Sequence, residues 1–129
     1  MMIVADTSTF LAVVLDEPEK RRIMALTRGH NLVAPEVLPF EVGNALTALM
    51  KKGILTPEQV ASAWDAAQAI PIEVRHIDIG SALGIACRFG IYAYDAYFLE
   101  CALSLRLPLL SLDKGMMRIA RELNIPVME

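Results

Sequence analysis

The chain has 129 residues, a formal net charge of −3 and a sequence pI near 5.4. This length is enough for one domain with a proper hydrophobic core, and the acidic balance argues against a broadly basic surface for nucleic acids. That argument weakens if several acids surround one bound cation. Hydrophobic residues make up 55% of the chain, more than the usual ~45–50%, which indicates a large core or an apolar face for self-association or a partner.

Membrane insertion and secretion are not expected. No apolar run approaches the ~18–20 residues that cross a bilayer. The N-terminal segment lacks a basic region and reaches Asp6 almost at once, unlike a secretory signal. Cys87 and Cys101 have no CxxC spacing, so we expect two buried free thiols. We therefore expect a cytoplasmic protein that makes no membrane contact.

In the first half of the chain, an apolar run at residues 2–5 predicts a buried strand, and a helix follows it. Asp16 to Glu19 resembles a helix N-cap with a capping box, which predicts a helix that ends near Gly29. A second strand is expected at residues 32–34. The longest helix is expected from about Glu36 to Lys52, with Gly53 just past its end.

In the second half, Thr56-Pro57-Glu58-Gln59 predicts the start of another helix, with proline at its first position. Strands are expected at residues 72–76, 108–112 and 125–127. Asp78 can cap a helix that runs toward Gly90, a further helix begins near Asp95, and the last covers residues 114–124.

This alternation of strands and helices predicts an α/β fold. None of the apolar runs alternates cleanly with polar residues, which is typical of strands covered on both faces. We expect one domain over residues 1–129, with three α/β/α layers and a mainly parallel central sheet of about four to five strands. Right-handed crossovers bring the carboxyl ends of such strands to one edge, where ligands bind.

Two acids follow predicted strands. Asp6 ends the first strand and Asp113 ends a later one, so both carboxylates are expected at the same edge of the sheet if both strands are central. Aspartate is also a good helix cap, and each residue can have that structural role alone.

Two further acids lie on predicted helices. Glu41 has Val37, Leu38, Asn44 and Ala45 as helical neighbours, a mostly apolar face on which a glutamate is expected only with a partner. Asp95 lies in a first helical turn, where the helix dipole favours a carboxylate. The dipole does not explain the aromatic residues that surround Asp95 in the sequence.

Four converging carboxylates repel one another unless they share a proton or a cation. Oxygen ligands of this kind favour Mg²⁺ or Mn²⁺. Neither histidine is at these positions: His30 lies in a predicted loop and His76 near a strand end, which makes zinc a poor candidate.

The four stretches, in this order, resemble the PIN-domain ribonucleases, and most of all the VapC toxins of toxin–antitoxin pairs. The likeness covers nearly the whole chain. VADTSTFLAVVLDEPE resembles the opening strand and helix of the family, PFEVGNAL its glutamate segment, YAYDAYFLECAL its third motif and LLSLDKGM its fourth. Some relatives have one more acid beyond the fourth motif, whereas here the next acid is Glu122, which puts a full second metal site in doubt.

The resemblance implies a Mg²⁺- or Mn²⁺-dependent endoribonuclease that leaves 5′-phosphate and 3′-hydroxyl ends. The catalytic and metal-binding residues would be Asp6, Glu41, Asp95 and Asp113. Ser111 stands where the family often has threonine, Thr7 and Ser8 are supporting candidates, and Lys114 is a candidate phosphate contact. The implied partners are an RNA substrate, a VapB-like antitoxin and a second copy of the chain in a homodimer.

Three other functions remain open at this stage. A haloacid-dehalogenase-type phosphatase needs an aspartate two positions after the first, where this chain has Ser8. A phosphoacceptor receiver domain usually has adjacent acids, and Asp6 stands alone. A catalytically silent PIN-like module would bind RNA or protein without metal-dependent cleavage.

Overall fold

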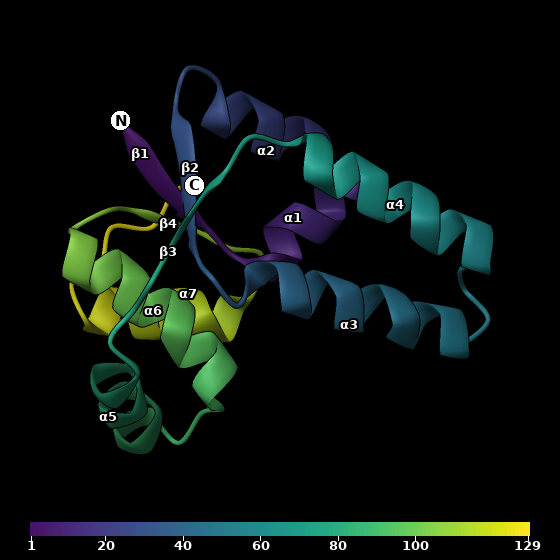
Figure 1. The fold of residues 1–129 in the computed structure, drawn as a ribbon. Coiled ribbons are helices and arrows are strands. Elements are labelled where there is room, and N and C mark those ends of the chain that lie inside the picture. Colours follow the sequence, from purple (N-terminus) through teal and green to yellow (C-terminus); the bar gives the residue numbers. More distant parts are fainter.

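The computed structural model describes residues 1–129 and contains one four-stranded sheet (Figure 1). The strand order is β3-β2-β1-β4, and every neighbouring pair is parallel. The strands are β1 Met2–Ala5, β2 Asn31–Pro35, β3 Glu73–Arg75 and β4 Leu109–Leu110. The α/β fold with a parallel sheet, predicted from the sequence, is therefore confirmed.

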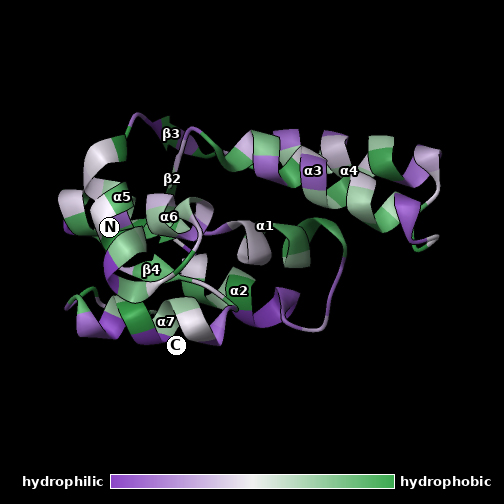
Figure 2. Ribbon diagram, turned by 90° about the horizontal axis from the view of Figure 1, so that it is seen from below, coloured by the Kyte–Doolittle hydropathy of each residue, from purple (hydrophilic) through white to green (hydrophobic).

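Seven helices connect and cover these strands. They are α1 Thr7–Val14, α2 Lys20–Thr27, α3 Leu38–Lys51, α4 Pro57–Ala69, α5 Ile79–Phe89, α6 Ala93–Leu105 and α7 Lys114–Glu122. None of them is both long and apolar enough to cross a membrane. Figure 2 shows the outward stripe of hydrophilic residues on α7, whose buried residues are Met116, Ile119 and Ala120.

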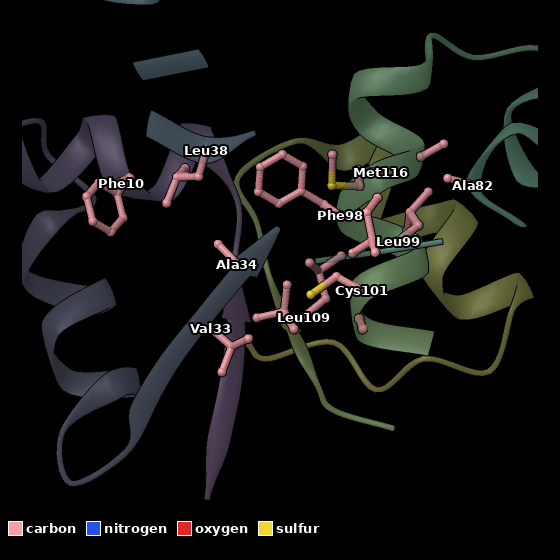
Figure 3. Close-up of a cluster of buried hydrophobic side chains, with 14 of the residues drawn as sticks. Phe10, Val33, Ala34, Leu38, Ala82, Phe98, Leu99, Cys101, Leu109 and Met116 are labelled. Carbon is pink, nitrogen blue, oxygen red and sulfur yellow. The ribbon is translucent and has the colours of Figure 1, made fainter. Parts of the chain in front are cut away.

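Apolar side chains of the central strand reach both faces of the sheet, because successive residues of a strand point to opposite sides. In β1, Val4 joins the larger core cluster, whereas Ile3 packs in a smaller cluster with Ala12 of α1 and Ile23 of α2. The larger cluster includes most of the buried residues of α6, among them Phe98 and Leu99 (Figure 3). Helices thus cover both faces, which explains why the central strand β1 is apolar throughout.

Helices α3 and α4 lie side by side and extend beyond the sheet (Figure 1). The predicted turn between them is confirmed: Lys52 ends α3, and Gly53 follows with a positive φ of 75°. Thr56 and Gln59 form the predicted capping box at the start of α4, with Pro57 at its first position. Helix α3 begins close to the sheet and α4 runs back toward it (Figure 1), so Glu41 in the first turn of α3 lies near Asp6 at the end of β1.

Three expectations about local structure were wrong. Asp16 does not cap α2, which begins after Glu19 without a side-chain cap; instead Asp16 has a φ of 55° and pairs with Lys20. Residues 125–127 form no strand, since only one bridge joins Val127 to Leu109. Cys101 is buried as expected, but Cys87 is exposed, because it lies on the outer side of the amphipathic α5.

Candidate active site

Asp6 lies at the carboxyl end of β1 and is 3% exposed. Its Oδ1 accepts hydrogen bonds from the hydroxyls of Ser8 and Thr9, both at 2.8 Å, and from the Thr9 N–H at 3.0 Å. Asp6 therefore caps α1, as the structural interpretation of this residue predicted. Burial raises the pKa of the Asp6 carboxyl, and the hydrogen bonds from Ser111, Thr9 and Ser8 oppose that rise.

Ser111 connects Asp6 to Asp113. The Ser111 hydroxyl donates to Asp6 Oδ2 at 2.5 Å and accepts a hydrogen bond from the Asp113 N–H at 2.9 Å. A second link runs through Ser8, whose hydroxyl accepts from the Leu112 N–H at 3.1 Å. The segments that follow β1 and β4 are therefore tied together, which fixes Asp6 relative to the backbone of Asp113. Asp113 itself is exposed and caps α7 by accepting from the Met116 N–H.

Glu41, in the first turn of α3, has one buried oxygen, Oε1, without a hydrogen-bond partner. The hydroxyl of Thr7 is also buried and unpaired. Thr7 is near enough to lower the pKa of Glu41 slightly, but no hydrogen bond of ordinary geometry joins the two. Burial, and then the negative charges of Asp95 and Asp6, raise the pKa of Glu41 to about 7. Neither oxygen has a hydrogen-bond partner of ordinary geometry within the chain, which leaves both available to a ligand.

Asp95 lies in the first turn of α6 and is partly buried. Its pKa is raised by burial first, and then by the charges of Asp113 and Asp6. Asp95 thus interacts electrostatically with Asp6, Glu41 and Asp113, so the fold brings all four predicted acids into one negatively charged region. Tyr92 and Tyr94, which flank Asp95 in sequence, are 85% and 58% exposed and do not enclose it.

The four carboxylates are close enough to repel, but they do not have metal-ligand spacing. No three Asp, Glu, His or Cys side chains in the chain are arranged to hold one ion. The oxygen-only donor set, with unpaired oxygens on Glu41 and Thr7, still suits a hard divalent cation such as Mg²⁺ or Mn²⁺. Both histidines lie apart from this set: His76 pairs with Glu36, and His30 precedes β2.

Two other residues near the site, Lys114 and Thr9, have surroundings that the structure defines directly. Lys114 is exposed in the first turn of α7, directly after Asp113, and takes part in none of the four ion pairs of the chain. Thr9 was missed at the sequence level, although its hydroxyl contacts both Asp6 Oδ1 and, at 3.1 Å, the carbonyl oxygen of Leu110. Its place three residues after an N-cap aspartate was a usable signal.

A hollow of about 530 Å³ opens beside the acids. Glu41 and Thr7 line it, and so do Phe40, Asn44 and Tyr94, none of which the sequence analysis selected as functional. Phe40 and Tyr94 come from different helices, α3 and α6. The hollow therefore connects the acidic region to two aromatic side chains.

These features define a class of protein: a parallel α/β domain with an acidic site at the carboxyl edge of its sheet. The family comparison is more specific, because the PIN domain family matches residues 3–122. The chain belongs to the PIN domain family. A search of curated protein sequences finds no match.

Several solved structures share the fold. PAE2754 from Pyrobaculum aerophilum is 18% identical, with a TM-score of 0.73 over 92% of this chain and 84% of that one. VapBC2 from Rickettsia felis, solved with a promoter DNA fragment, is 14% identical, with a TM-score of 0.70 over 98% and 97%. FitAcB from Neisseria gonorrhoeae is 17% identical, with a TM-score of 0.63 over 99% and 97%.

Proposed function

We propose that residues 1–129 act as one domain that hydrolyses RNA phosphodiester bonds, as a Mg²⁺- or Mn²⁺-dependent endoribonuclease of the VapC toxin type. The observation that carries the proposal is the convergence of Asp6, Glu41, Asp95 and Asp113, from four separate parts of the chain, on one region. Membership of the PIN domain family and the fold shared with VapBC2 support the same function.

The four carboxylates would hold the cation through oxygen atoms that include the unpaired Oε1 of Glu41. When bound, the cation supplies Lewis acidity that activates water and neutralises charge on the phosphoryl group. Ser111 and Ser8 keep Asp6 and the Asp113 segment in place through the hydrogen bonds described above. Asp113 is exposed, Glu41 and Asp95 are partly buried and Asp6 is buried, so Asp6 is the least accessible of the four acids.

Lys114 directly follows Asp113, so it is the basic residue nearest to the proposed site in the sequence. Its ammonium group is exposed and makes no ion pair, so it is free to contact a phosphate next to the cleaved bond. Such a contact would partly offset the repulsion between RNA and a chain of net charge −3.

An antitoxin of the VapB kind and a second copy of the chain are the proposed partners. The structures of VapBC2 and FitAcB have the same fold as this chain, which favours an antitoxin partner. Two apolar hollows, of about 410 and 260 Å³, adjoin each other, since Phe10 and Ile70 line both. They offer apolar surface next to the end of β1 for a partner segment. A gel-filtration mass equal to one chain at micromolar concentration would exclude the homodimer.

The function is tested by incubating the protein with a mixed RNA pool in Mn²⁺, with EDTA and the Asp95→Asn variant in parallel. We expect cleavage only in the tube that contains the wild-type protein and Mn²⁺ without EDTA. Glu58→Gln, an exposed acid in the first turn of α4, is the matched control and should cleave normally. RNA binding without cleavage in any tube would instead identify a silent binding module.

A further inference from the structure

Phe40 and Tyr94 are large aromatic residues that the fold leaves in water beside the acidic site. Phe40 is 78% exposed and Tyr94 is 58% exposed, although the chain has an extensive apolar core. Single exposed apolar residues are ordinary on protein surfaces. Two aromatic side chains from separate helices that line one hollow together with Glu41 form a more unusual arrangement.

The hollow has the volume to hold a planar ring. Its volume of about 530 Å³ lies within the range of ~300–1,000 Å³ that is typical of small-ligand pockets. Tyr94 is held in place by Tyr97, since the two rings meet edge to face with centroids 6.0 Å apart. A ring that is already oriented loses less conformational freedom when another ring stacks on it.

Polar groups lie in the same hollow. Asn44 is one helical turn after Phe40, and its exposed side-chain amide makes no hydrogen bond within the chain. An amide offers both a donor and an acceptor, which suits the edge of a nucleobase. Thr7 and Glu41 also line the hollow, and Glu41 joins it to the acidic region.

We propose that this hollow binds one unpaired base of a single-stranded RNA substrate, stacked against Phe40 and Tyr94, next to the phosphate that is cleaved. The inference rests on the proposed nuclease function and adds two residues, Phe40 and Tyr94, that hold a base of the substrate. Base stacking on aromatic side chains is the usual way in which proteins hold unpaired strands. A duplex keeps its bases paired and stacked, so it cannot fill the hollow in this way.

The test measures anisotropy of a fluorescein-labelled single-stranded RNA oligonucleotide in EDTA, where no cleavage competes with binding. We expect Phe40→Ala and Tyr94→Ala each to weaken binding by about tenfold. Tyr94→Phe, which keeps the ring, should bind like the wild type. Tyr92→Ala is the matched control, because Tyr92 is an exposed tyrosine two residues away that does not line the hollow; it should change binding less than twofold.

Duplex RNA of the same sequence should bind equally to all of these proteins. The proposal is overturned if neither alanine variant weakens single-strand binding, if Tyr92→Ala weakens it as much, or if duplex binding falls in parallel. Thermal melting checks the folding of each variant, and the exposure of both rings predicts little change.

Cleavage assays separate this inference from the proposed function. In Mn²⁺, the alanine variants should raise KM with little change in kcat, because the acids are intact. Ring-dependent binding without any cleavage by the wild type would leave the base site standing and refute the nuclease. Metal-dependent cleavage that neither alanine variant changes would support the nuclease and refute the base site.

Discussion

Replacing Glu41 with glutamine should stabilise the metal-free protein at alkaline pH. The substitution keeps the size of the side chain and removes a charge that burial, Asp95 and Asp6 all disfavour. The gain in stability should appear together with a loss of activity, because the same carboxylate is a proposed cation ligand. A residue with only a structural role would not show this opposition.

The magnitude follows from the pKa of Glu41, which is about 7 in the folded protein against an ordinary value of 4.5. Between these pH values the folded state holds more proton than the unfolded chain, so the free energy of unfolding falls as the pH rises. The penalty is absent below the lower pKa and complete above the upper one. It is ~3–4 kcal/mol at most, and solvent screening at a half-buried carboxylate reduces it to ~1–2 kcal/mol.

Urea or thermal denaturation in EDTA at about pH 5 and about pH 8 measures this effect. At the higher pH, Glu41→Gln should gain ~1–2 kcal/mol over the wild type, or about 3–8 °C in Tm, and most of that gain should vanish at the lower pH. Glu58→Gln, the exposed control, should change stability by less than ~0.5 kcal/mol at either pH. Equal stability of Glu41→Gln and wild type at about pH 8 would refute the raised pKa of Glu41, and with it the combined effect of burial and of the charges of Asp95 and Asp6.

Three further predictions concern the same framework. Ser111→Ala should lower the cleavage rate and cost ~1–3 kcal/mol of stability in urea denaturation, because Asp6 Oδ2 and the Asp113 N–H both lose their hydrogen-bond partner. A cleavage rate and a stability equal to those of the wild type would contradict the role of Ser111 in joining Asp6 to Asp113. Thr56→Ala should cost ~1 kcal/mol by removing the capping box, yet leave cleavage unchanged. Millimolar Mn²⁺ should raise the Tm of the wild type at about pH 8, and a flat response would count against a shared cation.

The parallel sheet, and the position of Asp6 and Asp113 at its carboxyl edge, were predictable from the sequence. Apolar runs without alternation indicate strands covered on both faces, and acids directly after them must meet at one edge of a parallel sheet. Asp6 and Asp113 therefore needed no long-range information beyond strand order. The capping box at Thr56 and Gln59 was equally clear, because it uses only neighbouring residues.

The remaining features depend on contacts that are distant in sequence. The bond between Ser111 and Asp6 spans 105 residues and is fixed by the pairing of β1 with β4. The N-cap pattern at Asp16 failed because the backbone there is left-handed and the side chain pairs with Lys20. Phe40 and Tyr94 read as ordinary apolar positions in the sequence, and only the relative placement of α3 and α6 brings them to one hollow.

The claim that one divalent cation is shared by the four acids is tested most directly by calorimetric titration of the purified protein with Mn²⁺. The wild type and Glu58→Gln should show the same saturable binding, and Asp95→Asn should bind at least tenfold more weakly while unfolding cooperatively. Equal binding by all three proteins, or no saturable binding by the wild type, would contradict the account.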